Sequence, residues 1–180
     1  MHKLLLLILI SFSINFHTIS QNTRVNGEII KGYGEFFTVE NPDIKTDTTA
    51  TFKVIFDVSK SSENRNEVNK YIVTAARFLN MHTHEGMKPK QLKAAITIHG
   101  SAWQDVLNNE AYKEKYGVVN PNFKLINELN AAGVDIIICG QTAKYREVTR
   151  QNINPSVKFA LSAMTALLQY QNNGYTFIKF

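Results

Sequence analysis

Short apolar runs alternate with longer amphipathic stretches from residue 51 onward. The runs over 52–58, 92–98 and 134–138 are rich in β-branched residues and have the length of buried strands. A fourth run over 175–180 predicts a closing strand. Continuous apolar strands separated by helices indicate a mostly parallel sheet that is covered on both faces. The pattern therefore predicts an α/β fold, a three-layer α/β/α sandwich with about five strands.

Helical periodicity fills the segments between the predicted strands. Apolar residues that repeat every three or four positions predict an amphipathic helix from residue 63 to about residue 80. The segment 81–90 contains glycine and proline, so it is expected to be a loop. Two short helical pieces are expected over 103–107 and 110–116.

Two Asn-Pro pairs predict the starts of two further helices. Asparagine caps the free amides of a first helical turn, and proline is tolerated just inside it. The pair at 120–121 predicts a helix that ends at Gly133. The pair at 154–155 predicts a helix that ends near Asn172.

The first twenty residues differ in composition from the rest of the chain. A short basic start over 1–3, an apolar stretch over 4–10 and small residues at Thr18 and Ser20 are the three parts of a secretory signal peptide. The apolar stretch is shorter than the ~20 residues needed to cross a bilayer. We therefore expect a signal peptide over 1–20, export to the periplasm or medium, and no stable membrane insertion after cleavage.

The chain after the predicted cleavage site divides into two parts. Residues 21–50 are polar and contain few residues to bury, so they predict an extended N-terminal arm that packs on the domain and includes at most a short strand. Residues 51–180 are expected to form one α/β domain with its own core.

Charge and motif content exclude several function classes. Removal of Lys3 with the signal peptide leaves 19 basic and 15 acidic residues. The basic residues are dispersed rather than gathered with exposed aromatic residues, so no nucleic-acid partner is expected. His82 and His84 lack a third ligand nearby, whereas zinc sites use three or four, so no metal is expected. Phosphate-loop and dinucleotide-binding motifs are absent from the sequence, and no cofactor is expected.

Candidate chemistry lies at the ends of two predicted strands. His99-Gly100 follows the second strand, and Cys139-Gly140 follows the third. The carboxyl ends of parallel strands meet at one edge of the sheet, where functional crevices form. A helix that begins after Gln141 or Thr142 would place its positive end near the Cys139 sulfur and lower the thiol pKa.

Alternative interpretations of these residues remain open. Free cysteine is often a buried, inert hydrophobe, and a histidine at a strand end is often structural. A lone cysteine in an oxidising compartment can also form an intermolecular bridge or serve as a reactive thiol. Asp57, at the end of the first strand, either lines the same crevice or caps the next turn. Trp103 is a further candidate for binding a ligand there, or a core residue.

Five motifs follow one another in an order typical of a known family. They are Lys-Val-Ile-Phe-Asp-Val at 53–58, Ile-His-Gly at 98–100, Asn-Pro-Asn at 120–122, Cys-Gly-Gln at 139–141 and Pro-x-Val-x-x-Ala-x-x-Ala at 155–163. In this order and spacing they resemble the DsrE/DsrF-like family, most closely its exported bacterial branch. The resemblance covers nearly all of the chain after the predicted cleavage site.

This resemblance has implications for assembly and activity. It implies a parallel α/β sandwich that forms homo-oligomers, often trimers or hexamers, with active sites close to subunit contacts. In sulfur-relay members, a cysteine after a central strand accepts a sulfane sulfur as a persulfide and passes it to another protein. Cys139 occupies the matching position, and His99 follows a neighbouring strand. The resemblance therefore implies a sulfurtransferase-like protein with a sulfur donor or acceptor protein as partner.

Three hypotheses follow for the function. In the first, the Cys139 thiolate carries a sulfane sulfur, His99 tunes or shuttles protons, and the amides around Gly140 and Gln141 steady the persulfide. In the second, the protein is a non-enzymatic oligomeric module that binds a small ligand, and the cysteine is incidental. In the third, the protein senses redox state and dimerises through Cys139. A carrier favours Cys139 on an accessible loop, and a binding module favours Cys139 inside a sealed pocket.

Overall fold

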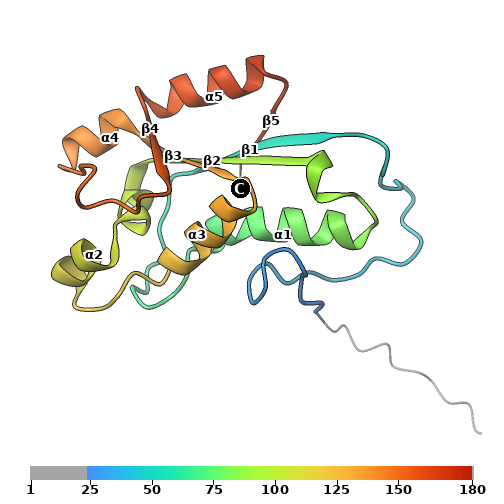
Figure 1. Cartoon of the computed structure of the whole chain (residues 1–180), viewed down its shortest axis with the longest axis horizontal. Coiled ribbons are helices and arrows are strands. Elements are labelled where there is room, and N and C mark those ends of the chain that lie inside the picture. The colour runs from blue at the N-terminus through green and yellow to red at the C-terminus, as the bar shows by residue number, and fades with distance from the viewer. Residues whose placement is uncertain (1–23, 180) are drawn as a thin grey trace, which may run out of the picture.

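Five strands, each parallel to its neighbours, form one sheet in the order β4-β3-β2-β1-β5 (Figure 1). The structure is a computed structural model that describes residues 24–179, so the predicted signal peptide and Phe180 lie outside the described residues. The strands are β1 (Phe52–Val58), β2 (Leu92–Ile98), β3 (Asp135–Cys139), β4 (Val157–Ala160) and β5 (Thr176–Lys179).

Helices cover both faces of this sheet. In Figure 1, α1 (Lys70–His84) and α3 (Phe123–Ala131) lie below the sheet, and α5 (Ala163–Asn172) lies above it. The predicted three-layer α/β/α sandwich of about five parallel strands is confirmed. The remaining helices are η1 (Pro89–Gln91), η2 (Gly100–Val106), α2 (Asn109–Tyr116) and α4 (Gly140–Tyr145), of which η1 and η2 are 3₁₀ helices.

A hydrophobic core lies on each side of the sheet, because successive strand residues point to opposite faces. The larger core, on the α1 and α3 side, includes Ile96 and Ile136. The smaller core, on the α5 side, consists of Ile55, Ala95, Ile137 and Ala166. Odd-numbered residues of β1, β2 and β3 therefore face α5.

The first helix lies later in the chain than its periodicity predicts. It covers Lys70–His84 rather than 63–80, so its last turn occupies part of the predicted loop over 81–90. The His82 ring packs edge-on against Phe52, with 5.4 Å between ring centroids. Such contacts stabilise a final turn that the local sequence alone does not specify.

The helix predicted from the second Asn-Pro pair is wrong in its first part. Val157–Ala160 forms β4, which pairs with β3, and the helix α5 begins only at Ala163. The Ser162 side chain caps α5 by accepting a hydrogen bond from the Thr165 amide at 3.0 Å. The apolar repeat is compatible with both structures over these few residues, and pairing with β3 decides between them.

Two other helix starts also differ from the predictions. Helix α3 begins at Phe123 because Asn120 uses its side chain to accept a hydrogen bond from the Asn122 amide and to donate to the Leu107 carbonyl. Helix α4 begins at Gly140, directly after Cys139, rather than after Gln141 or Thr142.

The buried side chain of Asn80 in α1 forms four hydrogen bonds with the described part of the N-terminal arm. Its Oδ1 accepts hydrogen bonds from the amides of Ile29 and Ile30, and its Nδ2 donates to the carbonyls of Ile30 and Tyr33. Val25 and Phe36 form a short antiparallel bridge within the arm. Among the described residues, no helix is long and apolar enough to span a membrane.

Candidate functional site

Cys139 ends β3 and immediately precedes α4, and only 6% of the residue is exposed. Burial by itself raises the pKa of the thiol. Hydrogen bonds from the amide and hydroxyl of Thr142 and from the amides of Ala163 and Gln141 outweigh it, so the pKa lies below its ordinary value. The amides belong to the first turns of α4 and α5. Two helix N-termini thus converge on one sulfur and favour its thiolate form.

Gly140 allows this close arrangement. A Cβ atom at this position would lie 2.4 Å from the carbonyl oxygen of Ala160 in β4. Any other residue would push α4 away from β4. The Gln141 side chain donates to the Leu161 carbonyl at 3.1 Å and bridges the same two segments. Gly140 and Gln141 therefore position the cradle of amides around Cys139.

A histidine, a carboxylate and a lysine form a linked group at the ends of β1, β2 and β5. His99 Nε2 lies 2.7 Å from Asp57 Oδ1, and Lys179 Nζ lies 3.1 Å from Asp57 Oδ2. The Asp57 side chain is 5% exposed, whereas 29% of the His99 side chain is exposed. Because a carboxylate only accepts hydrogen bonds, the contact with Asp57 places a hydrogen on Nε2 of His99. The other ring nitrogen, Nδ1, is then the one that can exchange a proton.

Strand register places this group and the thiol on one face at one edge of the sheet. Ile98 pairs with Ile138, so His99 and Cys139 are the next residues of adjacent parallel strands. Both positions face the α5 side. The backbones of the two strand ends therefore lie side by side, as predicted. Among the described residues, His99 and Cys139 form no hydrogen bond with each other.

The profile of the DsrE/DsrF-like family matches residues 53–180. The chain belongs to the DsrE/DsrF-like family. Among curated proteins, none matches it significantly.

Two solved structures share the DsrE-like fold. One is a protein of unknown function, MTH1491 from Methanobacterium thermoautotrophicum, with a TM-score of 0.54 and 12% identity over 72% of this chain and 99% of that one. The other is the ychN protein from E. coli, with a TM-score of 0.50 and 13% identity over 72% of this chain and 100% of that one. These similarities concern the fold alone.

Several groups at the site of this DsrE/DsrF-like protein are not evident from its sequence. Thr142 and Ala163 were missed as partners of the thiol, because the starts of α4 and α5 were misplaced. Lys179 was missed because its contact with Asp57 depends on strand order. Thr97, which pairs with Asp57 across β1 and β2, buries its hydroxyl without a hydrogen-bond partner among the described residues.

Gly100 and Trp103 occupy different parts of the edge. Gly100 has a φ of +55°, and a Cβ there would lie 2.5 Å from the Ser59 carbonyl oxygen, so glycine permits the close approach of the chain after β1. Trp103 packs with the core on the α1 and α3 side. The structure therefore does not place Trp103 on the face that holds Cys139.

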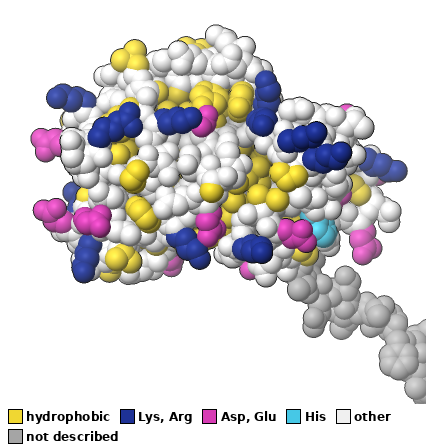
Figure 2. Space-filling model, in the orientation of Figure 1, with side chains coloured by type: hydrophobic (Ala, Val, Ile, Leu, Met, Phe, Trp, Pro, Cys, Tyr) yellow, Lys and Arg dark blue, Asp and Glu magenta, His cyan; other side chains and the backbone are white. Residues whose placement is uncertain are grey.

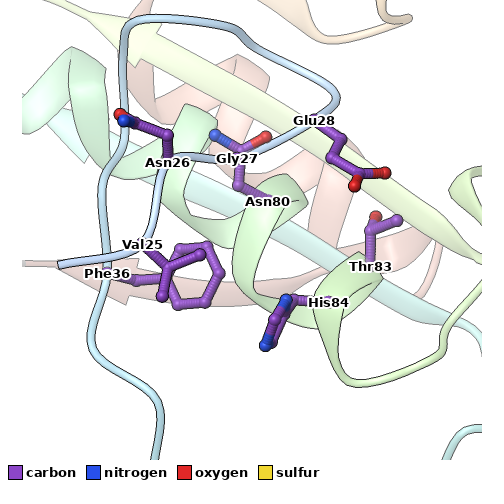
Figure 3. A pocket seen from close by; sticks show the side chains of 8 residues that line it. All are labelled: Val25, Asn26, Gly27, Glu28, Phe36, Asn80, Thr83 and His84. Carbon is purple, nitrogen blue, oxygen red and sulfur yellow. The ribbon is translucent and has the colours of Figure 1, made fainter. Parts of the chain in front are cut away.

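A cavity of about 310 Å³ lies elsewhere, between the arm and α1 (Figure 3). It is lined by Val25, Asn26, Gly27, Glu28, Phe36, Asn80, Thr83 and His84. Among the described residues, no group of three His, Cys, Asp or Glu side chains is placed to hold a metal, and the His84 ring instead packs against Phe36.

Proposed function

We propose that this DsrE/DsrF-like protein is a sulfur carrier in which Cys139 bears the sulfane sulfur. The observation that supports this proposal is the convergence of amides from α4 and α5 on the Cys139 sulfur. The same amides that favour a thiolate also favour the anionic form of a persulfide.

The sulfur transfer step is a nucleophilic displacement. The Cys139 thiolate attacks the outer sulfur of a donor persulfide, R–S–SH. A bond forms between Sγ and that sulfur, the donor S–S bond breaks, and the donor leaves as a thiolate, RS⁻. As an imidazolium, His99 gives its Nδ1 proton to the departing thiolate, and Asp57 holds the ring in place through Nε2. No external oxidant is needed, because the donor persulfide is reduced to a thiolate as the Cys139 thiolate becomes a persulfide.

The test uses the single cysteine of the chain, because every thiol modification then reports on Cys139. Intact mass spectrometry of the folded protein after brief polysulfide treatment is expected to show a gain of one sulfur. Cys139→Ser is expected to abolish the gain. Iodoacetamide is expected to alkylate Cys139 below the free-thiol pKa of ~8.5. A thiol that reacts only after unfolding would contradict the carrier function.

Binding of a small ligand without sulfur transfer is the second candidate function. The low exposure of Cys139 favours it, because a buried thiol can be part of a pocket wall. In that case Cys139→Ser would retain ligand binding and assembly.

Dimerisation through a Cys139 disulfide would show as a reducible covalent dimer. The low exposure of Cys139 argues against such a disulfide.

Export and self-assembly form part of the proposal. Composition of residues 1–20 supports export, and the test is the mass and the cellular fraction of the mature chain after expression in a Gram-negative host.

Exposed apolar side chains on α5 and the segment before it support a homo-oligomer. They are Leu161, Met164 and Leu168, with exposures of 71%, 72% and 61%, and hydrophobic side chains line the upper layer of Figure 2. Sedimentation of wild type against Met164→Lys tests this contact.

A further inference from the structure

A ladder of three cations and three aromatic rings lies at the end of the molecule where the strands end. Its members, in spatial order, are Arg65, Tyr116, Lys115, Trp103, Arg146 and Tyr145. Each cation lies over the ring beside it, and the distances from cation to ring centroid are between 4.9 and 5.9 Å. We refer to these six residues as the cation–aromatic ladder.

The ladder joins four segments that are far apart in the sequence. Arg65 follows β1, Trp103 belongs to η2, Lys115 and Tyr116 end α2, and Tyr145 and Arg146 end α4. Helices α2 and α4 lie at the same end of the molecule in Figure 1, on the left. Lys and Arg side chains are visible at the upper left of Figure 2, over this end.

The cations of the ladder are not neutralised by carboxylates. Among the described residues, Arg65, Lys115 and Arg146 form no ion pair. Arg65 donates to Ser61 Oγ at 3.4 Å and to the Ser62 carbonyl at 3.3 Å. It also acts at longer range on the buried Asp105 carboxylate. Aromatic rings orient these cations while leaving their charge available to an anion.

The acidic residues nearest the ladder in sequence form no ion pair with its cations in the part of the chain that the structure describes. They are the exposed Glu63, Glu67, Glu114 and Glu147 and the buried Asp105. After Cys139 the chain contains five Lys or Arg residues and a single acidic residue, Glu147. Lys158 and Lys179 pair with Asp135 and Asp57, whereas Lys144, Arg146 and Arg150 form no ion pair among the described residues and are available to an anionic partner.

One end of the ladder belongs to the helix that follows the thiol, whereas Trp103 lies on the other side of the sheet. Arg146 and Tyr145 end a helix that starts one residue after Cys139, and six helical residues span about 9 Å. Trp103 follows His99 by one 3₁₀ turn. Because Cys139 is 6% exposed, a rigid protein surface cannot reach its sulfur, whereas a flexible segment held beside it can.

We propose that the cation–aromatic ladder docks an acidic protein segment that presents a reactive cysteine to Cys139. This inference rests on the proposed sulfur transfer for the role of the partner cysteine, and on the ladder alone for the acidic character of the partner. A sulfur donor or acceptor must carry a thiol, so the proposed transfer favours a protein over a lipid surface or a nucleic acid, and arginine and aromatic side chains are also typical of protein interfaces. Charge complementarity speeds encounter and sets the orientation of the docked segment.

Direct binding is the first test, because Trp103 is the only tryptophan of the chain and lies within the ladder. A synthetic peptide with six glutamates is titrated into the full protein while tryptophan fluorescence is measured. A fluorescence change that weakens as salt rises is expected, and a peptide with six glutamines should give none. The variant Arg65→Gln/Lys115→Gln/Arg146→Gln is expected to weaken binding at least about tenfold.

The matched control removes three cations at the opposite end of the strands. The variant Lys88→Gln/Lys90→Gln/Lys93→Gln has the same change in net charge and should bind within about threefold of wild type. Circular dichroism verifies folding of both variants. If the first triple variant fails to fold, Lys115→Gln replaces it, because this side chain is exposed. Equal loss of glutamate-peptide binding in both triple variants would overturn the ladder as the docking site.

Reaction at Cys139 is the second test. The glutamate and glutamine peptides are extended by a cysteine that forms a mixed disulfide with a coloured thiol. Attack by the Cys139 thiolate forms a Cys139–peptide disulfide and releases the coloured thiolate. The glutamate peptide is expected to react at least about tenfold faster at low salt, and the ladder variant should lose this advantage. Reaction with neutral iodoacetamide should not change in that variant.

These outcomes separate the inference from the proposed function. Alkylation by iodoacetamide without any preference for the glutamate peptide would overturn the inference and leave the carrier function intact. Glutamate-peptide binding that depends on the ladder, with an inert Cys139, would contradict the carrier function and retain the acidic docking surface. Tighter binding of phosphatidylglycerol vesicles or of single-stranded DNA than of the glutamate peptide would overturn the choice of a protein partner.

Discussion

His99 and Asp57 are joined by a 2.7 Å contact between Nε2 and Oδ1 that links the ends of β2 and β1. The carboxylate is almost fully buried and also contacts Lys179 at 3.1 Å. A buried carboxylate that holds both an imidazole and an ammonium group fixes the ring beside the strand end that bears Cys139. This relationship suggests a positioning role for Asp57 in sulfur transfer.

Replacement of this carboxylate tests that role. Asp57→Asn is expected to slow persulfide transfer to an acceptor by up to about 10²-fold, because the imidazole loses its charged partner. The measurement is the transfer rate from persulfidated Cys139 as a function of pH. Lys179→Met, which leaves the His99 contact in place, should affect the rate less. Unchanged pH profiles in Asp57→Asn would show that the His99–Asp57 contact is purely structural.

Thr142 is expected to control the reactivity of Cys139. Its amide and hydroxyl both lower the pKa of the thiol. A lowered pKa means that the thiolate is populated at lower pH. Thr142→Val removes only the hydroxyl, so the midpoint of the alkylation rate against pH should move upward. Thr142→Ser retains the hydroxyl and should match wild type. Equal midpoints in all three proteins would rule out a hydroxyl contribution.

Asp105 predicts a pH dependence of stability. Burial raises its pKa to about 6, although hydrogen bonds from Ser61 and Asn69 lower it. Because the folded-state pKa exceeds the unfolded value of 3.8, the protonated form stabilises the fold. This stabilisation, at most about 3 kcal/mol, is fully present below pH 3.8 and is lost as pH rises through about 6.

The measurement for Asp105 is the free energy of unfolding in urea at several pH values between 4 and 8. The difference between wild type and Asp105→Asn isolates this residue, because other titrating groups contribute equally to both. Wild type should lose stability relative to the variant as pH rises. A difference that does not depend on pH would show that Asp105 ionises normally in the folded protein.

Asn80 is expected to hold the arm on α1. Asn80→Ala leaves four backbone hydrogen bonds to Ile29, Ile30 and Tyr33 unmade. The expected cost is about 1–3 kcal/mol in unfolding free energy, together with faster proteolysis of the arm. Asn80→Asp retains the hydrogen bonds accepted from Ile29 and Ile30, so its unfolding free energy should lie between those of wild type and Asn80→Ala. Alkylation of Cys139, which faces the opposite side of the sheet, should not change. Equal proteolysis of wild type and Asn80→Ala would contradict this anchoring.

The sequence predicted the strands better than the contacts between them. The three central strands have continuous apolar runs, and parallel pairing alone predicts that His99 and Cys139 lie at the same edge of the sheet. By contrast, Val157 was assigned to a helix, because four residues satisfy either periodicity and only pairing with β3 decides. That error moved the start of α5 and so concealed the Ala163 amide beside the thiol.

Other parts of the site depend on tertiary structure. Lys179 reaches Asp57 only because β5 lies beside β1, and neither residue reveals this order in its local sequence. The basic residues, which are dispersed along the chain, were expected to solvate the surface. Folding brings Arg65, Lys115 and Arg146 into line with aromatic rings from four segments. Local patterns do not encode such an arrangement.

The position of β5 beside β1 also affects how the protein is made and handled. During synthesis, β1 emerges long before β5, so Asp57 has no lysine beside it until most of the domain has been translated. Pairing between such distant segments is slow relative to local folding. A purification tag attached after β5 would begin next to Asp57 and His99, so a tag placed before the arm is the better choice for any activity assay.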